Sequence, residues 1–73
     1  MRITKDMVVL MHSMDIHASE CSSLRELRDV YCMAKRKLIN IGNTYHLTHE
    51  EYYSVSDFLY YVYKRELYRL KYE

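Results

Sequence analysis

The sequence predicts a small all-α protein, a three-helix bundle with short connections, and three observations support this prediction. Proline is absent and Gly42 is the only glycine, so the chain has few residues that break a helix. Three segments open with a helix-capping residue. Apolar residues then recur in each segment at spacings of three and four, the period of an amphipathic helix. With 73 residues, the chain is expected to form one domain over residues 1–73.

The first predicted helix covers residues 5–18. Thr4 precedes it and can accept a hydrogen bond from an early helical amide. One side of the helix carries Ile3, Met7, Leu10, Met11 and Met14, and the opposite side carries Val8, Val9 and Ile16. A helix that is apolar on two sides is usually buried on two sides. In so small a protein, the second side is a candidate contact with another chain.

The second predicted helix covers residues 24–41. Ser23 and Glu26 form a capping-box pair, in which the serine accepts from an early amide and the glutamate reaches back. A heptad-like seam of apolar residues follows, and it suits packing along another helix at a shallow angle. The seam consists of Leu24, Leu27, Tyr31, Ala34, Leu38 and Ile41. Gly42 is expected to end the helix in the left-handed conformation, with Asn43 beside it.

The third predicted helix covers residues 49–72, which is about 36 Å at the usual helical rise, so its C-terminal turns are free to project beyond the other helices. Thr48 and Glu51 form a second capping box, and Leu47 is placed to act as a hydrophobic staple. A broad apolar arc faces the expected core. The arc consists of Tyr52, Val55, Leu59, Val62, Tyr63, Leu67 and Leu70.

This third segment is rich in tyrosine, with seven among residues 47–72. Tyr53 and Tyr60 flank the apolar arc and are expected at the core boundary, with the ring buried and the hydroxyl in water. Tyrosine is enriched at protein interfaces, and a second group of tyrosines lies on the opposite face, near Ser54 and Asp57. The predicted partner-binding residues on that face are Tyr61, Lys64, Arg65, Tyr68 and Tyr72. The alternative is that this face is only solvated.

Glu66 falls inside the apolar arc, between Leu59 and Leu70. A buried carboxylate is costly unless it is paired. Glu66 either pairs with an arginine of the same fold or reaches solvent at a fraying helix end, or it receives a basic group from a partner. The sequence leaves these alternatives open.

The formal net charge is +1, but the charges are unevenly distributed. Arg25, Arg28, Lys35 and Arg36 follow one flank of the second helix, with Cys32 among them and Lys37 nearby. These cations are candidate contacts with an acidic partner or with phosphates. The alternative is a solvated face with local ion pairs, from Asp29 to Arg25 and from Glu26 to neighbouring cations. The near-zero net charge disfavours nucleic acid without excluding it.

The residues that carry chemistry form no recognisable motif. The histidines are His12, His17, His46 and His49, and the cysteines are Cys21 and Cys32. They do not show the close ligand pairs of a zinc site, so we expect no metal and no cofactor, and we expect the cysteines to be small packing residues. One glycine is too few for a phosphate-binding loop, and no serine lies in a nucleophile motif. We therefore expect a protein that is not an enzyme.

The N-terminal region lacks the features of a secretory leader, because no apolar stretch of 7–15 residues follows Met1 and Arg2. The longest aliphatic run, residues 7–11, is too short to span a bilayer. We expect a cytoplasmic protein with reduced thiols and no membrane contact.

Two local resemblances to known families are present. Residues 47–59 resemble part of the second helix of the small sporulation aspartyl-phosphate phosphatases. Tyr60 stands where that family has its essential aspartate, so this resemblance implies binding without phosphatase activity. Residues 21–27 and 45–48 are similar to a family of small helical nucleoid-associated modulators, which implies binding to partner proteins more than to DNA. Each resemblance covers less than half of the chain, and neither family is assigned.

The composition and the tyrosine-bearing face together predict a small intracellular regulator or inhibitor that binds another protein. Compact chains rich in tyrosine and methionine are typical of regulators from phages or mobile elements. The first alternative is a self-associating structural homo-oligomer, for example a homodimer, that buries the apolar sides of the first two helices. The second is a nucleic-acid-associated modulator that uses the basic flank of the second helix.

Overall fold

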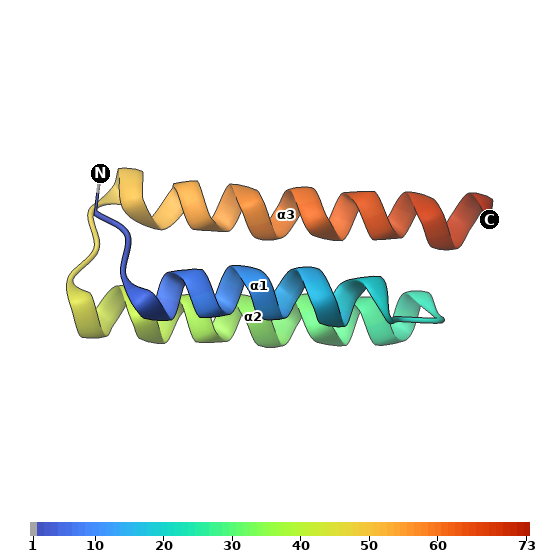
Figure 1. Cartoon of the computed structure of the whole chain (residues 1–73), viewed down its shortest axis with the longest axis horizontal. Coiled ribbons are helices and arrows are strands. Elements are labelled where there is room, and N and C mark those ends of the chain that lie inside the picture. Colours follow the sequence, from blue (N-terminus) through green and yellow to red (C-terminus); the bar gives the residue numbers. More distant parts are fainter. Residues whose placement is uncertain (1) are drawn as a thin grey trace.

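The computed structural model describes residues 2–73 and contains three helices, α1 (Lys5–Ser19), α2 (Leu24–Tyr45) and α3 (His49–Tyr72). α1 and α3 run in the same direction and α2 runs back, and the last turn of α3 reaches beyond the α1–α2 connection (Figure 1). Every helix packs against both others. The predicted all-α three-helix bundle is therefore confirmed.

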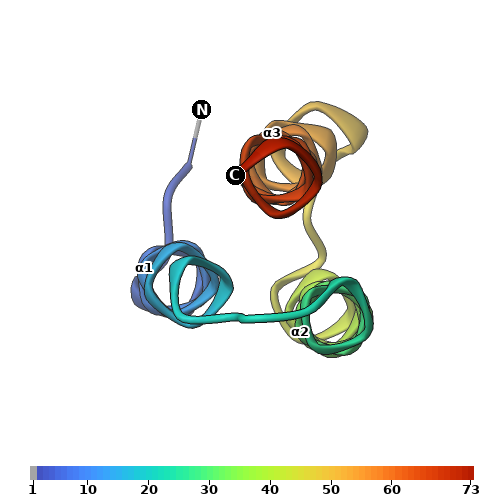
Figure 2. The same ribbon diagram turned by 90° about the vertical axis from the view of Figure 1, so that its right-hand side faces the viewer.

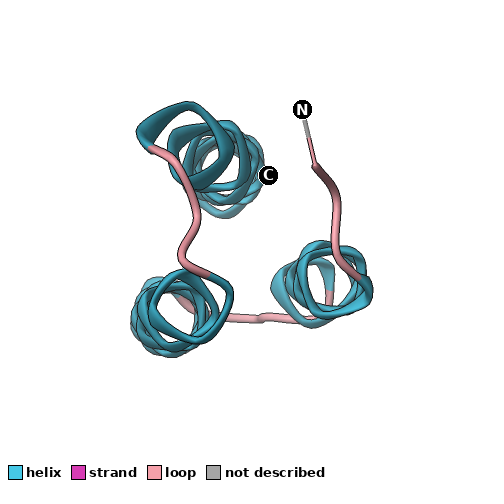
Figure 3. Cartoon of the chain, turned by 90° about the vertical axis from the view of Figure 1, so that its left-hand side faces the viewer, coloured by secondary structure: helices cyan, strands magenta, loops and turns pink. Residues whose placement is uncertain are grey.

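The end-on views show how the bundle is arranged. The three helices occupy the corners of a triangle, and with α1 running towards the viewer they follow one another counterclockwise (Figure 2). Seen from the opposite end, short loops join the helices, and the N-terminal segment rises from α1 towards the start of α3 (Figure 3). The sequence had left this packing order open.

The core runs along the axis of the bundle and is built from one stripe of each helix. The fully buried side chains of largest volume are Met7, Met14, Leu27, Leu38, Leu59 and Val62. Tyr52, Tyr63, Leu67 and Leu70 of the predicted α3 arc are partly buried against them. The helical spacing therefore identified the inward stripe of each helix correctly. Two residues predicted on these inward stripes are exposed instead. Ile3 precedes α1 and Leu24 is the first residue of α2, so both lie outside the packed part of the bundle.

Two of the three predicted helix starts are full capping boxes. The Thr4 hydroxyl accepts a hydrogen bond from the Met7 amide, and the Thr4 amide donates to the Met7 sulfur. The Thr48 hydroxyl accepts from the Glu51 amide at 3.2 Å, and the Glu51 carboxylate accepts from the Thr48 amide at 2.9 Å. These contacts satisfy amides that have no partner within the helix.

The start of α2 is capped in only one direction. The Ser23 hydroxyl accepts from the Glu26 amide at 3.1 Å, as predicted. The Glu26 carboxylate does not reach back to the Ser23 amide; it accepts from the hydroxyls of Ser22, at 2.9 Å, and Ser23. The carboxylate is bonded to two serine hydroxyls instead of the Ser23 amide, so the predicted box is half formed.

The predicted stop at Gly42 is wrong, because α2 continues to Tyr45 and His46 adopts the left-handed conformation with φ 52° and ψ 52°. Gly42 is helical, and its carbonyl accepts from the Leu47 amide at 3.1 Å. A Cβ atom at Gly42 would lie 3.2 Å from Cδ2 of Tyr52. The absence of a side chain at Gly42 therefore leaves room on α2 for the Tyr52 ring of α3.

Candidate functional site

The first candidate surface lies between α1 and α3. Side chains from both helices line a hollow of about 310 Å³ there, and the apolar ones are Ile3, Val8, Met11 and Phe58. Val8 and Ile3 are exposed, while Met11 and Phe58 are half-buried against the core. Val8, Val9 and Ile16 were predicted to form one second apolar side of α1. Only Val8 lines this hollow beside α3, whereas Val9 and Ile16 are exposed elsewhere on the helix.

The exposed tyrosines of α3 continue from this hollow. Tyr61, Tyr68 and Tyr72 are between 62 and 72% exposed. Tyr61 is one turn from Phe58 on the same side of the helix, and Tyr68 follows two turns later. The Tyr68 and Tyr72 rings lie 4.7 Å apart between centroids. We call the residues of the hollow together with these three tyrosines the α1–α3 face.

The two cations predicted on this face are placed differently. Arg65 donates to Asp15 of α1 at 2.6 Å and to Glu66 at 2.7 Å, so its charge is already paired within the fold. These hydrogen bonds raise the pKa of Arg65, the one with Asp15 most. The ammonium of Lys64 stands 5.8 Å from the centroid of the Tyr60 ring. Arg65 therefore acts mainly as a tie between α1 and α3 beside the tyrosines.

Glu66 is paired inside the fold. Its carboxylate accepts hydrogen bonds from Arg65 and Arg69, and its side chain is only 6% exposed. Burial by itself raises the pKa of Glu66, but hydrogen bonds and charges from Arg69 and Arg65 outweigh it and hold the pKa below the ordinary glutamate value. Arg69 also donates to the carbonyl of Cys21 at 2.9 Å. The alternative in which a partner supplies the basic group is excluded, because the carboxylate is already satisfied.

The second candidate surface lies between α2 and α3. Arg25 and Arg28 line a hollow of about 420 Å³ with Leu24, Tyr63 and Leu67. Arg36 lies on the same strip of α2 as Arg25, eleven residues or three turns further along. The four predicted cations of α2 are exposed. None of them forms a salt bridge with another of residues 2–73, so the predicted local ion pairs are absent from the part of the chain that is described.

Tyrosines from both helices meet at the middle of this surface. Tyr31 of α2 stacks on Tyr63 of α3 with centroids 4.4 Å apart, and Tyr60 lies 6.4 Å from both. The ammonium of Lys35 stands 4.7 Å from the centroid of the Tyr31 ring. Burial and the neighbouring tyrosines raise the pKa of Tyr31. We call this cluster, with the hollow beside Arg25 and Arg28 and a second hollow at Ile39, the α2–α3 face.

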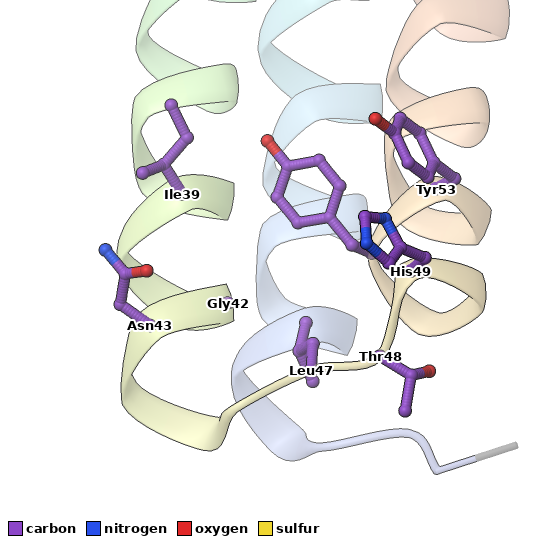
Figure 4. A pocket seen from close by; sticks show the side chains of 8 residues that line it. Ile39, Gly42, Asn43, Leu47, Thr48, His49 and Tyr53 are labelled. Atoms are coloured by element: carbon purple, nitrogen blue, oxygen red, sulfur yellow. The ribbon is translucent and has the colours of Figure 1, made fainter.

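A further hollow of about 390 Å³ extends this surface to the other end of α2 (Figure 4). The side chains of Ile39 and Asn43 border it on α2, and His49 and Tyr53 border it on α3, with Leu47 at the connection. The His49 and Tyr53 rings stack at 6.0 Å. Tyr53 and Tyr60 were predicted at the core boundary with the ring buried, but both are about half exposed.

The cysteines and histidines form no metal-binding group in the described part of the chain. Cys21 is buried, and burial raises the pKa of its thiol, whereas Cys32 is exposed; both are free. Cys21 is therefore the packing residue that was predicted, and Cys32 is not, because its position lies on the outer side of α2. Among residues 2–73, no three His, Cys, Asp or Glu side chains are grouped so that they could hold a metal ion. No helix in residues 2–73 has the length and apolar character needed to cross a membrane.

Sequence reasoning missed Phe58 and Met11 as members of the α1–α3 face. Phe58 precedes Tyr61 by three residues, so the helical period could have placed Phe58 on the tyrosine-bearing flank of α3. Its neighbours Val8 and Met11 come from a different helix. Their proximity depends on the packing order of the bundle, which the sequence left open.

Comparison with known proteins identifies no relative, because no protein-family model, curated protein or solved structure matches this chain.

Proposed function

We propose that this chain is a small cytoplasmic regulator or inhibitor that binds another protein through the α1–α3 face. It would change the activity of that protein by covering part of its surface, without catalysing a reaction. The observation that carries the proposal is the continuity of the face, from the apolar hollow of α1 and α3 along the exposed tyrosines of α3.

The chemistry of this face suits a protein partner. Exposed apolar patches of more than a few residues are uncommon on small soluble domains and often mark contact sites. Tyrosine provides a large contact area at little entropic cost. The ion pair between Arg65 and Asp15 holds α1 and α3 together beside the hollow. The face is therefore already shaped before a partner arrives, which lowers the cost of ordering it on binding.

The free thiols of Cys21 and Cys32 agree with a reducing compartment. The small size and the composition, rich in tyrosine and methionine, support a regulator of the kind that phages and mobile elements encode. Self-association is the second candidate, because Val9 and Ile16 remain exposed on the outer side of α1.

The test is affinity capture from a cell lysate with the tagged protein, with mass spectrometry and light scattering on the purified sample. Tyr61→Ala/Tyr68→Ala should keep the helical content and the melting temperature, since both side chains are exposed, and should lose most of the captured partner. The control is Met33→Ala, which removes an exposed large side chain outside both the α1–α3 face and the α2–α3 face.

Equal capture by Tyr61→Ala/Tyr68→Ala and by the wild type would overturn the proposed site. A stable dimer that captures nothing would instead favour the homo-oligomer. An obligate dimer would also show a melting temperature that rises with protein concentration.

A further inference from the structure

The α2–α3 face is basic although the whole chain is close to neutral. Arg25 and Arg28 line its hollow beside Leu24, Tyr63 and Leu67, and no carboxylate lines that hollow or the one at Ile39. The formal net charge of the chain is only +1. The two arginines therefore give this hollow a local positive charge that the net charge of the chain does not reveal.

The acidic residues of α2 do not line the hollow beside Arg25 and Arg28. Glu26 and Asp29 line a different hollow, together with Glu20 of α1. Asp29 lies one turn from Arg25 on the outer side of α2, but no salt bridge joins the two in the described part of the chain. Glu26 accepts hydrogen bonds from two serine hydroxyls and forms no salt bridge with another of residues 2–73. The unpaired cations can therefore attract an external negative group.

The tyrosines between the cations favour a protein over a nucleic acid. Tyr31 is stacked on Tyr63 and lies against the Lys35 ammonium. These contacts take up ring surface that a stacked nucleobase would need. The exposed ring edges of these tyrosines can pack against aliphatic side chains of a protein, and their hydroxyls can donate or accept hydrogen bonds.

The face also has the dimensions of a helix-binding groove. Leu24 and Leu67 provide apolar surface at one end, and Ile39 and Leu47 provide it at the other. Residues 24 and 39 are 15 positions apart on α2, a distance of about 22 Å along the helix. An amphipathic helix of about four turns would place apolar side chains at both ends and its charged flank against the cations.

We propose that the α2–α3 face binds an amphipathic, acidic helical segment of a partner protein. The cations Arg25, Arg28 and Lys35 contact its carboxylates, and the apolar hollows at the two ends of the face receive its apolar side chains. This proposal rests on the charge and shape of the α2–α3 face and is independent of the α1–α3 face.

Fluorescence anisotropy with labelled synthetic peptides tests the proposal. The probe is a 16-residue amphipathic helix with leucine on one face and glutamate on the other, and its counterpart carries lysine in place of every glutamate. A 20-nucleotide oligothymidylate is the third probe. The glutamate peptide should bind in 50 mM NaCl and should bind at least threefold more weakly in 200 mM NaCl, because salt screens exposed charges. The lysine peptide should not bind.

Arg25→Glu/Arg28→Glu should weaken binding of the glutamate peptide at least tenfold. The matched control is Lys5→Glu/Lys37→Glu, which makes the same change in net charge off this face and should change affinity less than threefold. All four side chains are exposed, so each variant should keep the wild-type melting temperature. Tyr61→Ala/Tyr68→Ala should bind the glutamate peptide like the wild type, which separates this proposal from the α1–α3 face.

Three results would overturn the proposal. One is equal binding of the glutamate and lysine peptides, or no binding of the glutamate peptide at millimolar concentration. Another is unchanged affinity in Arg25→Glu/Arg28→Glu. The third is tighter binding of the oligonucleotide than of the glutamate peptide, which would assign the face to nucleic acid.

Discussion

The two ends of the bundle are closed by two buried glutamates of α3 that are held in different ways. At the end with the α1–α2 connection, Glu66 accepts from two guanidinium groups, and one of these, Arg69, also bonds the carbonyl of Cys21. At the other end, Glu51 accepts from the backbone amides of Thr48 and Arg2. One end therefore depends on a buried ion-pair cluster, and the other on hydrogen bonds from backbone amides.

The Glu51 end draws the N-terminal segment into the fold. Arg2 also lies near the Glu51 carboxylate through its Nε, at 3.5 Å, and donates to the carbonyl of Tyr45 at 2.6 Å. The Tyr45 hydroxyl in turn donates to Asp6 at 2.7 Å. Most of these groups are exposed, so water can replace a lost partner there. At the Glu66 end, loss of the carboxylate leaves Arg69 with only backbone carbonyls as partners, while Arg65 keeps its bond to Asp15.

Glu66→Ala should have the largest effect on stability. It removes two charge-assisted hydrogen bonds and leaves a small cavity, at a cost of about 2–3 kcal/mol, moderated because Arg65 and Arg69 can turn towards solvent. For a domain of this size, that lowers the melting temperature by about 10–20 °C. Thermal denaturation followed by circular dichroism measures it.

The matched comparison is Glu51→Ala, which should lower the melting temperature by only a few degrees, since it removes one cap and an exposed tie. Glu66→Gln keeps the size of the side chain and one acceptor, so it should fall between wild type and Glu66→Ala. If Glu51→Ala proved as destabilising as Glu66→Ala, the proposed distinction between the two ends would be wrong.

Acidification should destabilise the fold through both glutamates. Hydrogen bonding by the Thr48 amide is the main cause that lowers the pKa of Glu51, and burial only partly opposes it. The pKa of Glu66 is lowered as well, since its arginine partners outweigh burial. Each carboxyl therefore has a lower pKa in the folded than in the unfolded state. The stabilisation is fully present above the ordinary value of 4.5 and is lost as the pH falls through the folded-state values.

The measurement is the melting temperature between pH 6 and pH 3. It should fall with pH in the wild type, and it should fall less steeply in Glu51→Gln/Glu66→Gln, because the amides do not titrate. An equally steep decrease in the double variant would assign the acid sensitivity to other carboxyl groups.

The local features of the fold could be predicted from the sequence, and the features that join distant segments could not. Thr4 and Thr48 cap their helices through residues three positions away, so the motif is visible in the sequence. The sequence identifies Glu66 as a carboxylate within the apolar arc. It does not reveal that Arg69, which bonds Glu66, also bonds the carbonyl of Cys21, 48 positions before Arg69. The α1–α3 hollow likewise combines residues from two helices, and its existence depends on the packing order.

The smallest expected effect on the melting temperature is at the end of α2. There the glycine is residue 42, whereas the residue with left-handed backbone angles is His46. In Gly42→Ala, the helical preference of alanine gains about 1 kcal/mol, while the new Cβ crowds the Tyr52 ring. The ring is only half-buried and can shift, so the melting temperature should change by no more than about 3 °C.

His46→Gly should raise the melting temperature slightly, by about 2–5 °C, because glycine adopts a positive φ without strain. A large loss in Gly42→Ala together with no gain in His46→Gly would indicate that α2 ends at Gly42 in solution.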